Sequence, residues 1–234
     1  MVKTNHLMPG KLGPQGTHCI RCGTCCMKGG PTLHKDDRPL FEKGILKENN
    51  CYTLRKGEVV RHIDDTLMAL EQEMIKIKGQ GEDWRCMFYD DHQKACAIYD
   101  QRPMECRALK CWDLRELNEA MAKPRLQRKH LIHPDDGILR VVGAHEQRCA
   151  YEVLETSVKG LGGPDGENAV ERILDLLHYD HQTRVLLIDK LNLDPKALDF
   201  FFGRPLTTTI RMFGLGVTQK GHDLLLAPLE PHGS

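Results

Sequence analysis

A run of closely spaced cysteines near the start of the chain limits its fold more than any other feature. Cys19, Cys22, Cys25 and Cys26 lie within one short segment. Two residues separate each of the first three thiols from the next, as in the C-x2-C-x2-C run that binds iron–sulfur clusters in ferredoxins. We therefore expect Cys19, Cys22 and Cys25 to form one ligand set with a remote fourth ligand. Cys26, adjacent to Cys25, is expected to serve a second site or a bridge.

A second group of cysteines follows in the middle of the chain. Aromatic and β-rich segments on either side of a polar turn predict a hairpin over residues 84–99. Such a hairpin would carry Cys86 and Cys96 on neighbouring strands. Pro103 then predicts the first turn of a helix, and Cys106 would lie on that helix. Two thiol-rich segments in one chain indicate a shared metal region.

The two motifs together resemble those of the YkgJ-type cysteine-cluster proteins of bacteria and archaea, a family with a zinc- or iron-chelating domain. The resemblance rests on CxxCxxCC at residues 19–26 and on C-x-I-Y-x-x-R-P-x-x-C-R at residues 96–107. It covers roughly residues 15–150 and implies metal binding without a particular reaction. It also implies a ligand on the preceding strand, matched by Cys86, and one beyond the second motif, for which Cys149 is a looser match.

The number of thiols bears on which metal is bound. Structural zinc takes four ligands, whereas two four-iron clusters need eight thiolates. The chain has more candidate thiol ligands than the four of a single zinc site, which favours iron–sulfur clusters, two of the [4Fe-4S] type. A polynuclear zinc site with bridging thiolates would use the same residues. The pairing of ligands stays open, and Cys51 is expected to be a buried thiol. The candidate ligands are Cys19, Cys22, Cys25, Cys26, Cys86, Cys96, Cys106, Cys111 and Cys149.

A composition shift divides the chain, because a glycine-rich stretch near residue 160 is followed by sequence without cysteine. We expect an α+β fold: a cysteine-cluster domain over residues 1–158 with short hairpin strands and helices, and a helical extension over residues 167–234. The apolar segment at residues 137–143 predicts a strand. Apolar side chains at helical spacing predict one long or two short helices after the boundary, and a further helix over residues 194–202.

Composition excludes several classes of function. The 33 acidic residues balance the 33 basic residues, so no overall field points to nucleic acid or a membrane. No stretch is apolar for the ~20 residues needed to cross a bilayer. We expect a cytoplasmic protein, where cysteine-rich sequence indicates metal binding before disulfides.

An electron-transfer or redox-accessory role explains many thiolates without a recognisable catalytic base, and it implies a redox partner protein. The alternative is a zinc-binding structural or interaction module, or a metallochaperone. The C-x3-C-x2-C radical motif and a Gly-rich nucleotide loop are both absent from the sequence. Whether the protein is an enzyme, and its oligomeric state, are left open.

Overall fold

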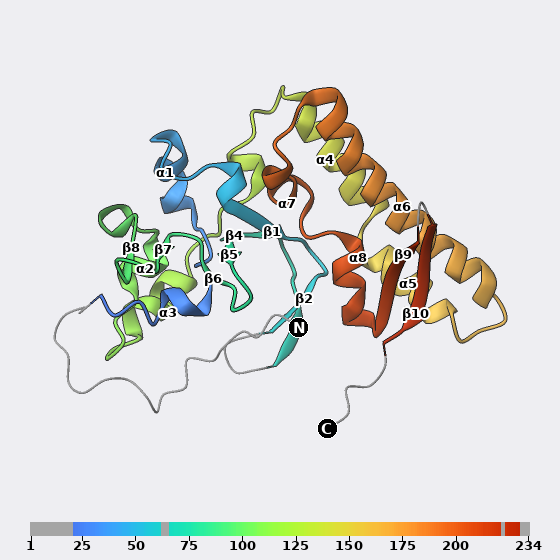
Figure 1. Cartoon of the computed structure of the whole chain (residues 1–234), viewed down its shortest axis with the longest axis horizontal. Helices are drawn as coiled ribbons and strands as arrows, with labels where there is room; N and C mark the ends of the chain where they lie inside the picture. Colours follow the sequence, from blue (N-terminus) through green and yellow to red (C-terminus); the bar gives the residue numbers. More distant parts are fainter. Residues whose placement is uncertain (1–20, 62–65, 221–222, 230–234) are drawn as a thin grey trace.

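The chain is arranged as a cysteine-bearing end, a central strand pair and a helical end (Figure 1). A computed structural model describes residues 21–61, 66–220 and 223–229. The expected α+β class is confirmed, since helices are interspersed with short antiparallel strand pairs and helices dominate toward the C-terminus. No helix among the described residues is both long and apolar enough to cross a bilayer.

The strands of the described residues form antiparallel pairs. The pairs are β1 (Cys51–Leu54) with β4 (Met74–Ile77), β2 (Val59–Arg61) with β3 (Leu67–Ala69), β5 (Gly79–Gln80) with β6 (Arg85–Cys86), β7 (Tyr89–Asp90) with β8 (Ala95–Cys96), and β9 (Leu215–Lys220) with β10 (Asp223–Pro228).

The α-helices differ greatly in length between the two ends. Those near the cysteines have one or two turns, and the longest lies at the helical end. They are α1 (Arg38–Glu42), α2 (Met104–Ala108), α3 (Arg115–Met121), α4 (Gly137–Arg148), α5 (Tyr151–Gly160), α6 (Gly166–Leu191), α7 (Leu198–Phe202) and α8 (Leu206–Thr209).

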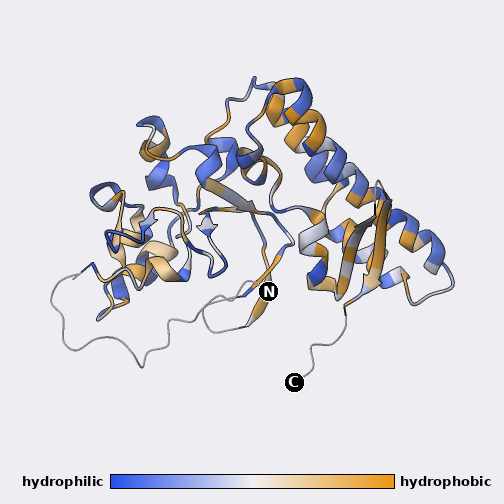
Figure 2. Ribbon diagram, in the orientation of Figure 1, coloured by the Kyte–Doolittle hydropathy of each residue, from blue (hydrophilic) through white to orange (hydrophobic). Residues whose placement is uncertain are grey.

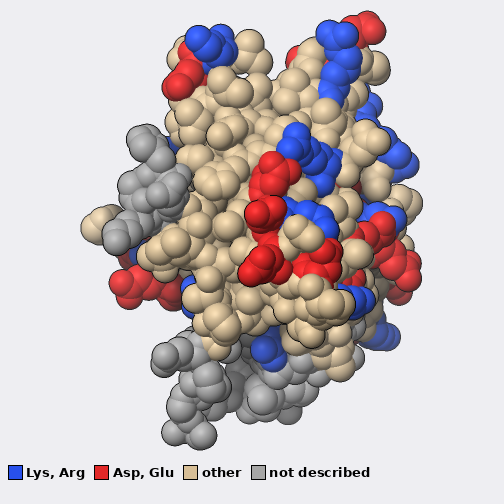
Figure 3. Space-filling view, turned by 90° about the vertical axis from the view of Figure 1, so that its right-hand side faces the viewer, with Lys and Arg blue, Asp and Glu red and all other residues tan. Residues whose placement is uncertain are grey.

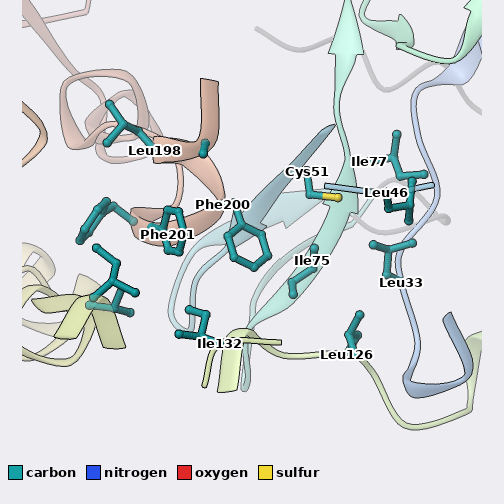
Figure 4. Close-up of a cluster of buried hydrophobic side chains, with 14 of the residues drawn as sticks. Leu33, Leu46, Cys51, Ile75, Ile77, Leu126, Ile132, Leu198, Phe200 and Phe201 are labelled. Carbon is teal, nitrogen blue, oxygen red and sulfur yellow. The ribbon is translucent and has the colours of Figure 1, made fainter. Parts of the chain in front are cut away.

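The largest core lies where β1 and β4 pack against α7 (Figure 4). Cys51, Ile75 and Phe200 are fully buried there. Cys51 is therefore a buried thiol, as expected, and the phenylalanines of α7 are core residues. Because α7 comes from the C-terminal part of the chain, the predicted helical extension contributes to the core under the cysteine-bearing end. The expected boundary near residue 160 stays a prediction.

A second core fills the helical end, where α5, α6 and α8 meet. Ile173 and Leu177 lie one turn apart on α6, and both are fully buried together with Leu206. Apolar and polar residues alternate around α6 in Figure 2, which is the pattern expected of a helix with one buried face. The chain then forms the β9–β10 hairpin, which the sequence did not predict.

One local prediction was wrong, and another was only partly correct. The segment expected as a strand at residues 137–143 begins α4, because the Asp136 side chain accepts a hydrogen bond from the Ile138 amide and caps the helix. Ile138 and Val142 are then buried on one face at helical spacing. A hairpin does form within residues 84–99, but it joins β7 to β8. Cys86 lies on β6, which pairs with β5, so the strands of Cys86 and Cys96 are not paired with each other.

Candidate metal centre

Seven cysteines from four separate segments line one cavity of about 320 Å³ at the cysteine-bearing end. Four of the expected ligands come from the second cysteine group and three from the N-terminal run. The cysteines are Cys22, Cys25, Cys26, Cys86, Cys96, Cys106 and Cys111. Cys19 lies outside the described residues.

The N-terminal run reaches the cavity through a tight turn at Gly23. The carbonyl of Gly23 accepts hydrogen bonds from the amides of Cys26 and Met27, at 2.8 and 3.1 Å, and the chain continues as the 3-10 helix η1 (Cys26–Lys28). Gly23 has a φ of +74°, and a Cβ there would lie 2.4 Å from Cε2 of Tyr89. Both the backbone angle and the contact with Tyr89 require glycine at this position.

The remaining ligand candidates are held by very short elements. Cys86 lies on β6 opposite Gly79, and Cys96 lies on β8 opposite Tyr89. Cys106 lies on α2, as the sequence predicted. Strands and helices of this size are not stable alone, so the position of each thiol depends on the contacts made by its neighbours.

One such contact fixes α2 from a distance. The carboxylate of Asp37, which is fully buried, accepts hydrogen bonds from the Met104 amide at 2.7 Å and from the His34 amide at 3.0 Å. Asp37 therefore satisfies a free amide in the first turn of the helix that carries Cys106. Sequence reasoning missed this role, because nothing in the local pattern connects Asp37 with a helix 67 residues away.

Glu105 ties α2 to the same segment. Its carboxylate contacts Nε2 of His34 at 2.9 Å and accepts a hydrogen bond from the Thr32 amide at 2.8 Å. Burial alone would lower the pKa of His34, but the hydrogen bond to Glu105 raises it overall. Glu105 therefore holds α2 against the segment that carries Thr32 and His34.

The thiols are not equivalent electrostatically. A hydrogen bond from Cys26 lowers the pKa of both Cys25 and Cys96 to about 6, whereas the pKa of Cys26 itself is raised because it supplies these bonds. Burial raises the pKa of Cys86 to about 11 and also raises that of Cys106. These lowered pKa values favour the thiolate at Cys25 and Cys96, and thiolate is the form in which cysteine binds metal.

Two arginines stack on one tyrosine at the cavity. The Cζ atoms of Arg21 and Arg102 lie 3.9 and 3.6 Å from the ring centroid of Tyr99, and all three residues line the cavity. The positive charge of Arg102 helps to lower the pKa of Cys25, behind the hydrogen bond from Cys26. Arg102 therefore faces the cysteine cavity.

Residues 18–127 match the CxxCxxCC family, which is described as a zinc- or iron-chelating domain. We call this segment the CxxCxxCC domain after that match. The match ends before α4, so the helical end lies outside it. The expected family is confirmed, and with it the coarser expectation of a metal-chelating cysteine domain.

A curated relative resembles part of the same chain. The chain is 32% identical over 90 residues to "Uncharacterized protein MJ0661" of Methanocaldococcus jannaschii. That alignment covers 38% of this chain and 42% of the relative, so the chain spans less than half of that protein. No solved structure matches the chain significantly.

Cys149 is not brought to the cavity of the CxxCxxCC domain. It follows α4, is fully buried in the core of the helical end, and its Sγ lies 3.9 Å from the carbonyl oxygen of Leu176. Burial raises its pKa to about 12, which disfavours the thiolate. Its surroundings are those of a core residue.

The donors around the cavity are soft sulfur ligands. In tetrahedral zinc sites the thiolates lie about 3.8 Å apart, as follows from Zn–S bonds of about 2.3 Å. Among the described residues, no three Cys, His, Asp or Glu side chains converge in this way on a single point. Seven thiols nevertheless line the same cavity. Soft sulfur donors of this kind fit zinc or iron.

Proposed function

We propose that the CxxCxxCC domain binds iron–sulfur clusters and that the protein has an electron-transfer or redox-accessory role. The observation that carries the proposal is the gathering of seven thiols around one cavity. A single structural zinc ion would leave several of them without a ligand role. A cluster held by thiolates supplies one-electron transfer. We further propose a cytoplasmic location, where thiols remain reduced, and a redox partner protein.

The proposed ligands follow from position and charge. Cys19, Cys22 and Cys25 would bind one cluster with a remote fourth thiol. Cys19 would bring the thiols of this region to eight, the number that two [4Fe-4S] clusters need. Cys25 and Cys96 offer thiolates at neutral pH. Cys149 is left out of the proposed set because of its place in the other core.

The rest of the cavity wall would tune such a cluster. Arg102 brings a positive charge to a site where thiolates accumulate negative charge, and Tyr99 holds its guanidinium in place. Phe88, Ile98 and Leu117 form apolar parts of the wall and would limit contact with water. Charge, hydrogen bonding and solvent exposure are the properties that set a cluster potential.

Zinc remains the second candidate because of one observation. Cys26 is hydrogen-bonded to both Cys25 and Cys96, so these three sulfurs are close together. Close sulfurs could join in a zinc site with bridging thiolates. The protein would then be a structural module or a metal carrier, and no redox partner would be needed.

Metal and sulfide analysis of protein purified without oxygen separates the two candidates. We expect iron with an equal amount of acid-labile sulfide and a broad absorption band at about 400 nm. A value of eight irons per chain would support two four-iron clusters. Stoichiometric zinc without colour or sulfide would overturn the redox proposal in favour of the structural or metal-carrier role.

A further inference from the structure

A second cavity, of about 490 Å³, lies beside the metal centre and is basic. We call it the basic cleft. It lies between β3 and the segment that follows α3. Its wall includes Lys35, Lys123, Arg125 and Lys129 against the single carboxylate of Glu71. For a chain whose total charge is balanced, this is a local concentration of one sign.

Much of this charge is not neutralised within the fold. Lys123 pairs with Asp36 at 3.0 Å, whereas no ion pair is recorded for Lys35 or Lys129 in the described part of the chain. His130, also in the wall, responds to this field: burial lowers its pKa, and the charges of Lys35 and Lys129 lower it further. The helical end is different, because the face shown in Figure 3 has acidic side chains at its middle with lysines and arginines around them.

The basic cleft and the cysteine cavity share structural parts. Met121, at the end of α3, lines both. The β2–β3 pair is a second shared part. Arg61 on β2 lines the cysteine cavity, and its partner in the strand register is Leu67 on β3. The next residue on β3, Met68, lines the basic cleft. A molecule seated in the cleft would therefore lie against the wall of the metal centre.

Two exposed apolar residues lie on β3. Met68, in the wall of the basic cleft, is 41% exposed, and Leu67, which precedes it on the strand, is 67% exposed. Protein interfaces commonly combine methionine and other apolar anchors with a charged rim. A small anion would use the charges of the cleft and gain nothing from these side chains. The combination therefore favours a protein partner over a small ligand.

We propose that the basic cleft and β3 form the docking surface for an acidic redox protein. The inference rests on the proposed redox function and names the charge of the partner and the face it uses. Complementary charge raises the rate of encounter and fixes orientation, and its effect weakens as salt is added. A partner with carboxylates around its own redox centre would be held with that centre facing the cysteine-bearing end.

Binding of a flavodoxin, an acidic one-electron carrier, to the full-length protein tests the proposal. Fluorescence anisotropy of the labelled probe at low salt should give a dissociation constant that rises with ionic strength. The double variant Lys35→Glu, Lys129→Glu should weaken binding at least tenfold. The double variant Lys159→Glu, Lys190→Glu, at exposed lysines on α5 and α6, changes the net charge by the same amount and should leave binding unchanged.

The outcomes separate the docking surface from the proposed function. Three results would contradict the proposed docking surface. They are equal binding by the Lys35→Glu, Lys129→Glu variant, binding that is independent of salt, and no binding by the unaltered protein. Tighter binding of a basic cytochrome than of flavodoxin would also overturn it. If flavodoxin binds as expected but the protein contains zinc without iron, the acidic-partner surface stands and the redox function fails. Metal content must be equal in all variants, and circular dichroism checks their fold.

Discussion

The two ends of the molecule are built in different ways. At the cysteine-bearing end, β5, β6, β7 and β8 each have two residues and α2 has five. At the helical end, α6 alone has 26 residues and buries leucines and isoleucines along one face. The cysteine-bearing end therefore combines many candidate ligands with little regular structure, whereas the helical end combines long regular structure with few candidate ligands.

This difference indicates where each region obtains its stability. A region of short elements cannot bury enough apolar surface to be stable alone, and bound metal commonly makes up the deficit. The helical end has its own core and a buried polar network. We therefore expect metal binding and folding to be coupled at one end and largely independent at the other. The following predictions test that contrast, beginning with the largest effect.

Loss of one proposed ligand should unfold the cysteine-bearing end selectively. We expect Cys106→Ala to lose metal, to aggregate readily and to lose hydrogen-exchange protection in residues 79–121, because metal-binding free energy is folding free energy in such sites. Amides of α6 should keep their protection. Metal analysis and hydrogen exchange followed by mass spectrometry measure both effects.

Cys149→Ala is the matched control. It removes a fully buried thiol from the other core and should keep its metal, with only a modest loss of stability. Full metal content in the Cys106 variant, or loss of metal in the Cys149 variant, would contradict the assignment of the two cysteines.

A change at Asp180 should produce the reverse pattern. Asp180 is 1% exposed and accepts hydrogen bonds from His145 at 2.7 Å, Arg184 at 3.0 Å and the Leu206 amide at 2.9 Å. Asp180→Ala would leave the Arg184 charge buried without this partner, which typically costs about 3–5 kcal/mol. We expect denaturant unfolding to show this loss while metal per chain is unchanged. A parallel loss of metal would mean that the two ends are coupled.

A smaller effect is expected from the turn at Gly23. Gly23→Ala should cost about 1–2 kcal/mol for the left-handed backbone, with a further cost from the contact with Tyr89 and reduced metal content. Gly44→Ala is the control, since Gly44 has a φ of +69° but open space around it. Melting temperature and metal content should separate the two variants. Identical behaviour would show that Tyr89 moves freely.

The smallest effect concerns pH. Burial lowers the pKa of His145 despite its hydrogen bond to Asp180, so the folded state keeps this histidine neutral. Its contribution to stability is present above the unfolded pKa of about 6.5 and is lost as pH falls below that value, because only the unfolded chain takes up the proton. Burial would raise the pKa of Asp180, but its partners lower it, which adds a loss at more acid pH.

Denaturant unfolding between pH 8 and pH 5 measures this dependence. His145→Gln should flatten the decline near pH 6.5 relative to the unaltered protein. An unchanged slope in the variant would assign the decline to other histidines.

The sequence predicted the metal-binding region better than its architecture. The two motifs contain five of the thiols that line the cavity, the predicted hairpin added Cys86, and Pro103 placed Cys106 on a helix. These are local properties, since a proline and a repeated spacing act on their immediate neighbours. Cys111, grouped with the same residues, also lines the cavity.

The failures involve long-range contacts. Cys149 was included because the resemblance implies a ligand beyond the second motif, yet its thiol is buried in the core of the helical end. The segment at residues 137–143 is apolar enough to be predicted as a strand. It forms a helix because Asp136 caps its first turn and because one face of the helix is buried. Asp37 could not be recognised, because its importance depends on a helix far along the chain.

The unequal exposure of the thiols has a consequence for the life of the protein. Cys22 and Cys25 are exposed, whereas Cys86 is buried. Molecules that donate metal therefore meet the N-terminal thiols first, and so do oxidants such as peroxide. The centre would be assembled and damaged from the same side, and repair after oxidation would not require the buried side to open.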